Sequence, residues 1–152
     1  MSFLKTIAPS IVHTPAFGVY KILGRTLAAH YHEANIETPF PWSDTWYYHT
    51  DDIGLAGILP NLVFNSNLYK PDKFDCEDYA LKAQVLCAER YGLNTLRYTY
   101  GTLPLGAHGF NTMWVGDRFL IFEPNLGMAE QLDGNCAFEM GQYGYLPKVV
   151  LL

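Results

Sequence analysis

The most regular stretch of apolar and polar residues begins at Cys76. Between residues 80 and 88 most positions are apolar, a pattern typical of a helix that is covered on nearly all sides within a domain. Asp75 is a favourable N-cap, and Asp78 occupies the third helical position, where an acid forms an imperfect capping box and complements the positive helix end. Gly92 follows the last apolar position and is a common C-terminal signal. We therefore predict a buried helix that begins at Cys76.

Strand-like patterns follow this helix. We expect strands over residues 95–100, 108–115, 118–123 and 148–152. The pair Gly116-Asp117 separates the second and third of these segments and is typical of a two-residue hairpin turn. Residues 101–107, which contain two glycines and a proline, predict a flexible loop.

The first half of the chain is less regular. We expect an arm or short helix over 1–15, an amphipathic helix over 16–33, an aromatic-rich connector over 36–50 and a short helix over 51–59 capped by Asp51. Together these elements predict an α+β fold in which a buried central helix, with a cysteine at its N-terminus, packs on an antiparallel sheet. We expect a single domain over residues 1–152. Its motif-bearing core covers about 42–127, and a helical N-terminal extension covers 1–41.

Composition narrows the class of protein. Of the 152 residues, 49% are hydrophobic and 16% are charged, which excludes a disordered protein. The net charge is −5, so we expect neither nucleic acid nor a membrane as a partner. No apolar run reaches the roughly 18 residues of a membrane span. Three cysteines are too few for a disulfide scaffold, and no signal peptide is recognisable, which favours a cytoplasmic protein.

The predicted hairpin brings candidate chemistry to one face of the sheet. With Gly116 and Asp117 as the turn, His108 lies opposite Asn125. Directly opposed residues share a face and diagonal neighbours remain within reach, so Glu123 lies beside them. A histidine next to a carboxylate in a core-rich domain is a candidate for acid–base chemistry.

Cys76 adds a candidate nucleophile, because a helix N-terminus favours a thiolate. If its helix packs on the face that bears His108, the site has a nucleophile, a base and an orienter of the base. Glu123 is the first candidate for the orienter, and Asn125 is the alternative. The acids that flank the thiol oppose a thiolate unless they point away, which the helix geometry permits because capping aims Asp75 at the backbone.

A resemblance to the transglutaminase-like and papain-like cysteine peptidase superfamily rests on three segments: YKPDKFDCEDYALKAQVLC, AHGFNTMWV and FLIFEPNLG. In that superfamily a D-C-[DE]-[DE]-[YF]-A segment opens a buried helix, a His opens a later strand, and an acidic or amide residue lies on the next strand. The E-P-[NQ] ending is similar to the peptidase module of a fungal chimeric agglutinin and its phage-encoded relatives. The resemblance to phage-encoded proteins implies a virion-associated protein as the alternative to a cytoplasmic one. The resemblance implies Cys76 as nucleophile, His108 as base and Glu123 as orienter.

The activity implied by this resemblance is a thiol-dependent hydrolase or acyl-transferase that acts on a peptide or protein substrate. Papain-type members place a Gln upstream of the nucleophile as an oxyanion donor, and no Gln occurs between Trp42 and Asp75. Trp46, Asn65 and Asn67 are the possible substitutes. The acidic residues lack EF-hand-like spacing, so we expect neither a metal nor a cofactor.

Two other functions stay open. The chain is a catalytically inactive structural or binding protein on the same scaffold if Cys76 is only a buried thiol, as free cysteines often are. It is a metal-dependent hydrolase if Cys76, His108 and an acid hold a metal ion with one open position. The rate of thiol labelling at Cys76 tests the first alternative, and metal analysis tests the second.

Overall fold

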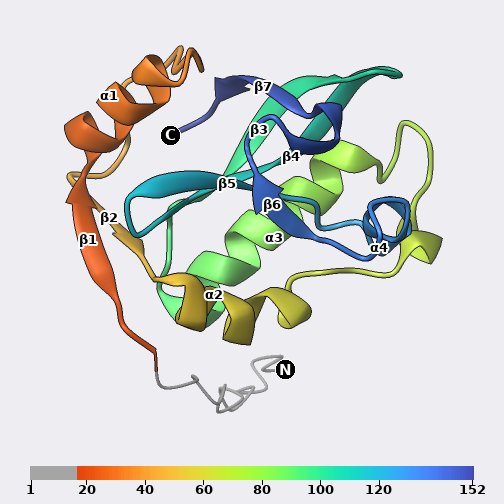
Figure 1. Ribbon diagram of the computed structural model, residues 1–152, viewed down its shortest axis with the longest axis horizontal. Coiled ribbons are helices and arrows are strands. Elements are labelled where there is room, and N and C mark those ends of the chain that lie inside the picture. Colours follow the sequence, from red (N-terminus) through yellow and green to blue (C-terminus); the bar gives the residue numbers. More distant parts are fainter. Residues whose placement is uncertain (1–16) are drawn as a thin grey trace, which may run out of the picture.

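The computed structural model describes residues 17–152, which form two antiparallel sheets and four α-helices (Figure 1). The larger sheet has the strand order β6-β5-β4-β3-β7. Its strands are β3 (Leu96–Leu103), β4 (Gly106–Val115), β5 (Arg118–Phe122), β6 (Ala137–Glu139) and β7 (Leu146–Val150). The smaller sheet pairs β1 (Tyr20–Leu23) with β2 (Trp46–His49). The helices are α1 (Gly24–Glu33), α2 (Asp52–Ile58), α3 (Cys76–Tyr91) and α4 (Leu126–Glu130).

The predicted α+β class is confirmed. Three short 3-10 turns complete the elements. They are η1 (Leu59–Asn61), η2 (Ser66–Leu68) and η3 (Gln142–Gly144). The elements do not by themselves distinguish a papain-like core from other α+β arrangements. No helix within residues 17–152 has the length and apolar character needed to cross a membrane.

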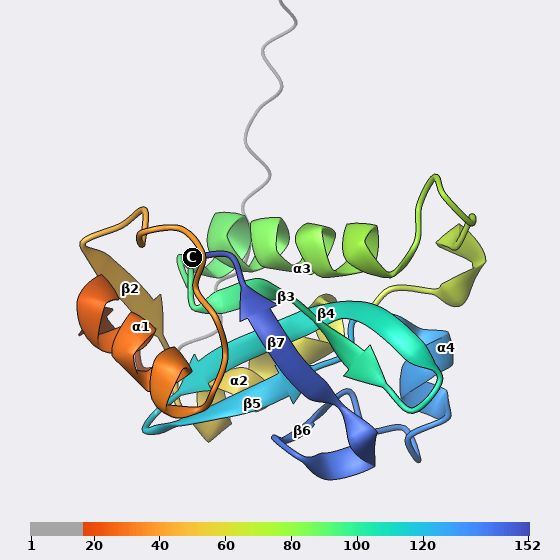
Figure 2. The same cartoon turned by 90° about the horizontal axis from the view of Figure 1, so that it is seen from above.

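Different elements cover the two faces of the five-stranded sheet (Figure 2). On one face α2 and α3 pack against Met113 and Leu120. On the other face α1 and the C-terminal residues pack against Trp114 and Phe119, and a smaller aromatic cluster contains Tyr145. Because alternate residues of a strand point to opposite faces, β4 and β5 contribute side chains to both layers.

The hairpin of β4 and β5 has the predicted register. Asn111 pairs with Phe122, and Thr112 pairs with Ile121. In the turn, Gly116 has a φ of +62°, a left-handed conformation that glycine adopts without steric cost. The sequence pattern and the turn chemistry therefore determined this register correctly.

The predicted flexible loop over 101–107 is wrong. β3 and β4 extend toward each other until only Pro104 and Leu105 separate them. Gly101 remains within β3, where a Cβ would lie 2.9 Å from the Phe110 ring. The glycine therefore makes room for a buried ring within β3, although the local sequence is typical of a loop.

The start and end of α3 are confirmed, but its complete burial is not. Asp75 and Asp78 form the capping box, and Gly92 ends the helix with a φ of 66°. Leu81 is 42% exposed, however, and Val85 is 60% exposed. The sheet covers one side of α3, and Figure 2 shows no other element of residues 17–152 over its outer side.

Residues 17–50 depart most from the sequence prediction. The segment expected to be one helix forms β1 and then α1, which begins only at Gly24. The expected irregular connector contains β2, and Lys21 pairs with Tyr48 across the two strands. This pairing joins distant segments, so local periodicity does not report it. The predicted arm over 1–15 lies outside the described residues.

The remaining elements agree with the sequence. The short helix predicted over 51–59 is α2, and Asp51 Oδ1 accepts a hydrogen bond from the Gly54 N–H at 2.9 Å. The predicted C-terminal strand is β7. On its outer side, the Glu37 N–H donates to the Lys148 carbonyl at 2.7 Å, and the Val150 N–H donates to the Glu37 carbonyl at 2.9 Å.

Candidate functional site

His108 and Glu123 form a buried pair beyond the last paired residues of the β4–β5 hairpin. His108 Nε2 lies 2.8 Å from Glu123 Oε2, and Glu123 is only 1% exposed. The Asn125 N–H donates to Glu123 Oε1 at 2.9 Å. The Tyr145 hydroxyl donates to Oε2 at 2.8 Å. Both carboxylate oxygens therefore have donors, as a buried charge requires.

A glycine beside His108 allows the start of α3 to approach the sheet. A Cβ at Gly109 would lie 3.0 Å from Glu77 Cα and 3.1 Å from Glu77 N. The Gly109 N–H also donates to Cys76 Sγ at 3.4 Å. The missing side chain at Gly109 thus determines how close the Cys76 thiol comes to the strand that carries His108.

The helix that carries Cys76 does not pack on the predicted face. α3 packs on the side of Met113, whereas the His108 ring lies against the rings of Phe110 and Tyr145 from the opposite layer. Cys76 and His108 nevertheless line one cavity. The expectation of packing on the same face is therefore wrong, and the two residues meet at the end of the sheet instead.

His108 carries a proton at neutral pH. Burial on its own lowers the pKa of His108, but hydrogen bonds and charge interactions with Cys76 and Glu123 outweigh this effect and raise it to about 9. The site at pH 7 therefore contains an imidazolium next to a buried carboxylate.

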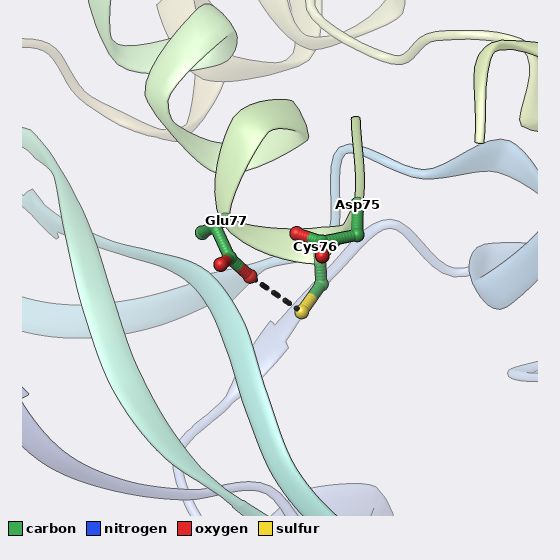
Figure 3. A group of neighbouring side chains, drawn as sticks. All are labelled: Asp75, Cys76 and Glu77. Atoms are coloured by element: carbon green, nitrogen blue, oxygen red, sulfur yellow. Dashed lines mark hydrogen bonds between the residues drawn. The ribbon is translucent and has the colours of Figure 1, made fainter. Parts of the chain in front are cut away.

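The acids that flank Cys76 do not all point away from its sulfur. The thiol donates to Glu77 Oε2 at 3.4 Å, and Figure 3 shows the Glu77 carboxylate turned toward the sulfur. A hydrogen bond between the side chains of Asp75 and Glu77 raises the pKa of Asp75 and lowers the pKa of Glu77. Glu77 is therefore not one of the acids that point away from the sulfur.

A metal set made of Cys76, His108 and an acid is not assembled. The group of possible ligands within 4.8 Å of one another consists of Asp75, Cys76 and Glu77. These side chains already hydrogen-bond to one another, and His108 Nε2 is occupied by Glu123. Asp75 Oδ1 is buried without a hydrogen-bond partner, but the Asp75 side chain as a whole is only half-buried, and we propose no metal there.

A cavity of about 480 Å³ opens over the His108–Glu123 pair. Its lining residues are Ser66, Tyr69, Cys76, Ala107, His108, Asn125, Gly127, Met128 and Gln131. A Cβ at Gly127 would lie 2.8 Å from Ser66 Cβ, so this glycine lets α4 approach the η2 turn closely. The volume falls within the range of small-molecule sites, and most of the lining side chains can form hydrogen bonds.

The suggested oxyanion donors do not line this cavity. Trp46 lies on β2, with Lys21 Nζ 4.4 Å from the centre of its ring. Asn65 Oδ1 accepts from the Asn67 N–H at 2.9 Å and caps η2. Asn67 lines a separate hollow. The Asn125 side chain caps α4 through a bond from the Gly127 N–H at 3.0 Å, so it is the backbone of Asn125 that contacts Glu123.

Sequence reasoning missed several residues of the site, and three of them show why. Tyr145 holds Glu123, and Ser66 and Tyr69 form part of the cavity wall. Each lies in a segment without regular periodicity, and nothing nearby in the sequence marks its partner. A buried tyrosine needs a partner for its hydroxyl, which is the only signal that could have drawn attention to Tyr145.

Comparison with known proteins places the fold but not a family. No family model matches the chain, and no curated protein does. The fold is similar to a solved "PSL1a-E64 complex", with a TM-score of 0.63 and 19% identity over 87% of this chain and 51% of the other. It is also similar to the Polyporus squamosus lectin bound to the human-type influenza-binding epitope Neu5Acα2-6Galβ1-4GlcNAc. There the TM-score is 0.61 and the identity is 17%, over 87% of this chain and 49% of the other.

These neighbours correct three predictions. The chain spans about half the length of each, and at this identity the likeness concerns the fold alone. The second of these structures is that of a lectin, and neither is described as a peptidase or a transglutaminase. On this comparison we withdraw the predicted superfamily, the thiol-dependent hydrolase and the peptide or protein substrate.

Proposed function

We propose that this chain is a binding protein and that its ligand site is the cavity over the His108–Glu123 pair. The observation that carries the proposal is the lining of this cavity, in which donors and acceptors gather around one buried ion pair. Binding sites place a small number of such groups to fix the orientation of a ligand. In this proposal His108, Cys76 and Asn125 contact the ligand, and Glu123 positions His108.

The chemistry of the lining favours a carbohydrate as the ligand. Hydroxyl, amide and imidazole groups are provided by Ser66, Asn125, Gln131 and His108, and the half-exposed ring of Tyr69 offers a flat surface at the rim. Sugar hydroxyls both donate and accept hydrogen bonds, so they match this mixture of groups. The glycan held by one structural neighbour supports the same class, although this chain corresponds to half of that protein.

The first experiment measures binding of Neu5Acα2-6Galβ1-4GlcNAc by calorimetry and by NMR of the labelled protein. We expect saturable binding with shifts at His108 and Asn125. His108→Gln should weaken binding about tenfold or more, because a charged hydrogen bond is lost. His30→Gln is the matched control, since His30 stacks on Trp114 at 4.5 Å outside the cavity. Binding that is absent, or that responds equally to both variants, contradicts the proposed site.

A second experiment tests the thiol directly. Burial raises the pKa of Cys87 to about 12 and also raises the pKa of Cys136, so both are internal references for slow labelling by iodoacetamide. A binding protein should leave peptides intact. Its mass should also stay unchanged after incubation with E64, the compound in the complex of the first structural neighbour. Peptide cleavage, together with labelling of Cys76 that is much faster than at the references and depends on His108, would overturn the proposal.

A further inference from the structure

We propose that Tyr145 is a positioning residue whose hydroxyl fixes the Glu123 carboxylate and, through it, the orientation of the His108 ring. The hydroxyl and His108 Nε2 both contact Glu123 Oε2, each at 2.8 Å. Tyr145 is 1% exposed, so water does not compete for this bond. The inference goes beyond the proposed function, because it concerns how the pair is held and applies to any ligand.

Ring packing fixes the position from which Tyr145 donates. The centre of its ring lies 5.8 Å from that of His108, 5.1 Å from that of Phe110 and 5.0 Å from that of Phe138. All three contacts are edge-to-face, the geometry that aromatic pairs favour. The Tyr145 ring is therefore held on several sides, and its hydroxyl can only point toward the Glu123 carboxylate.

The turn before Tyr145 also contacts the hairpin that carries His108. Gly144 has a φ of +75°, and a Cβ there would lie 2.8 Å from Pro104 Cγ. Pro104 lies between β3 and β4, and β4 carries His108. Tyr145 and His108 thus belong to segments that pack on each other in two places, so the position of one is coupled to the position of the other.

Loss of the hydroxyl would weaken the charge partner of His108. Oε2 would keep only the imidazole as a donor, and the carboxylate could turn about its terminal bond, held on its other oxygen by Asn125. The groups that face His108 are Cys76 from α3, Glu123 after β5 and Tyr145 before β7. Since burial by itself lowers the pKa of His108, a looser carboxylate shifts this pKa downward.

The test is an NMR titration of the His108 ring in Tyr145→Phe and in the control Tyr143→Phe. Phenylalanine keeps the packed ring and removes only the hydroxyl. We expect Tyr145→Phe to lower the pKa of His108 by about one pH unit. Tyr143 is exposed and its hydroxyl bonds to Asn135 at 2.8 Å, so Tyr143→Phe should leave the titration unchanged. An unchanged or raised pKa in Tyr145→Phe would overturn the proposal.

A measurement on the unmodified protein covers the case in which Tyr145→Phe fails to fold. The hydroxyl proton of Tyr145 should exchange slowly with water and show a cross-peak to the His108 ring, unlike that of Tyr143. If the hydroxyl proton of Tyr145 exchanged with water as fast as that of Tyr143, the proposal would be wrong. These readouts need no ligand, so a failure of carbohydrate binding and a failure of this proposal are distinguishable.

Discussion

The proton on His108 should make the stability of this protein depend on pH. The folded pKa is about 9 and the ordinary value is 6.5, so the folded state binds this proton more tightly than the unfolded state. The contribution is fully present below about pH 6.5 and is lost as the pH rises through about 9. At about 1.4 kcal/mol for each pH unit between the two pKa values, the proton contributes about 3 kcal/mol.

Urea unfolding of the wild type and of His108→Gln, from about pH 6 to about pH 9.5, measures this contribution. The difference in unfolding free energy between the two proteins should change by about 3 kcal/mol across this range, because groups common to both cancel. Glu123→Gln should lose part of this pH dependence, since it removes one of the two partners, Cys76 and Glu123, that raise the pKa of His108. If His108→Gln keeps the pH dependence of the wild type, the ion pair is not its source and the reasoning fails.

Three substitutions test other parts of the structure by urea unfolding. Gly109→Ala should cost about 1–3 kcal/mol, because its methyl group meets the backbone of Glu77. Gly57→Ala is the control: it adds a methyl group with nothing within 4 Å, and it should stabilise α2 by up to about 1 kcal/mol. A neutral Gly109→Ala would contradict the close approach of α3. Gly92→Ala should cost about 1 kcal/mol because the residue has a φ of 66°, and no loss would argue against a left-handed C-cap. Val85→Lys should change stability by less than about 0.5 kcal/mol, and a large loss would show that the outer side of α3 is covered.

Features set by neighbouring residues could be predicted from the sequence. The start and end of α3 follow from Asp75, Asp78 and Gly92, whose side chains and backbone act within one turn. The register of the β4–β5 hairpin follows from its two-residue turn, and this register placed His108 near Glu123. In each case the interaction that decides the structure spans only a few residues.

Features set by distant contacts could not be predicted in this way. Three features depend on which elements cover one another. They are the pairing of β1 with β2, the exposure of Val85, and the continuation of β3 past Gly101. The position of Tyr145 depends on a turn that packs on another hairpin. The turn of Glu77 toward the sulfur could not be read from sequence either, because several side-chain orientations are compatible with the same helix start.

The borders of the five-stranded sheet affect how the protein behaves at high concentration. The unpaired backbone groups of an edge strand can bind strands of other molecules and so begin aggregation. Here one border strand, β6, has only three residues. The other, β7, contains Pro147, which lacks an N–H, and Lys148, and Glu37 occupies part of its outer side. Within residues 17–152 neither border therefore offers a long unprotected row of backbone groups, which disfavours the growth of intermolecular sheets.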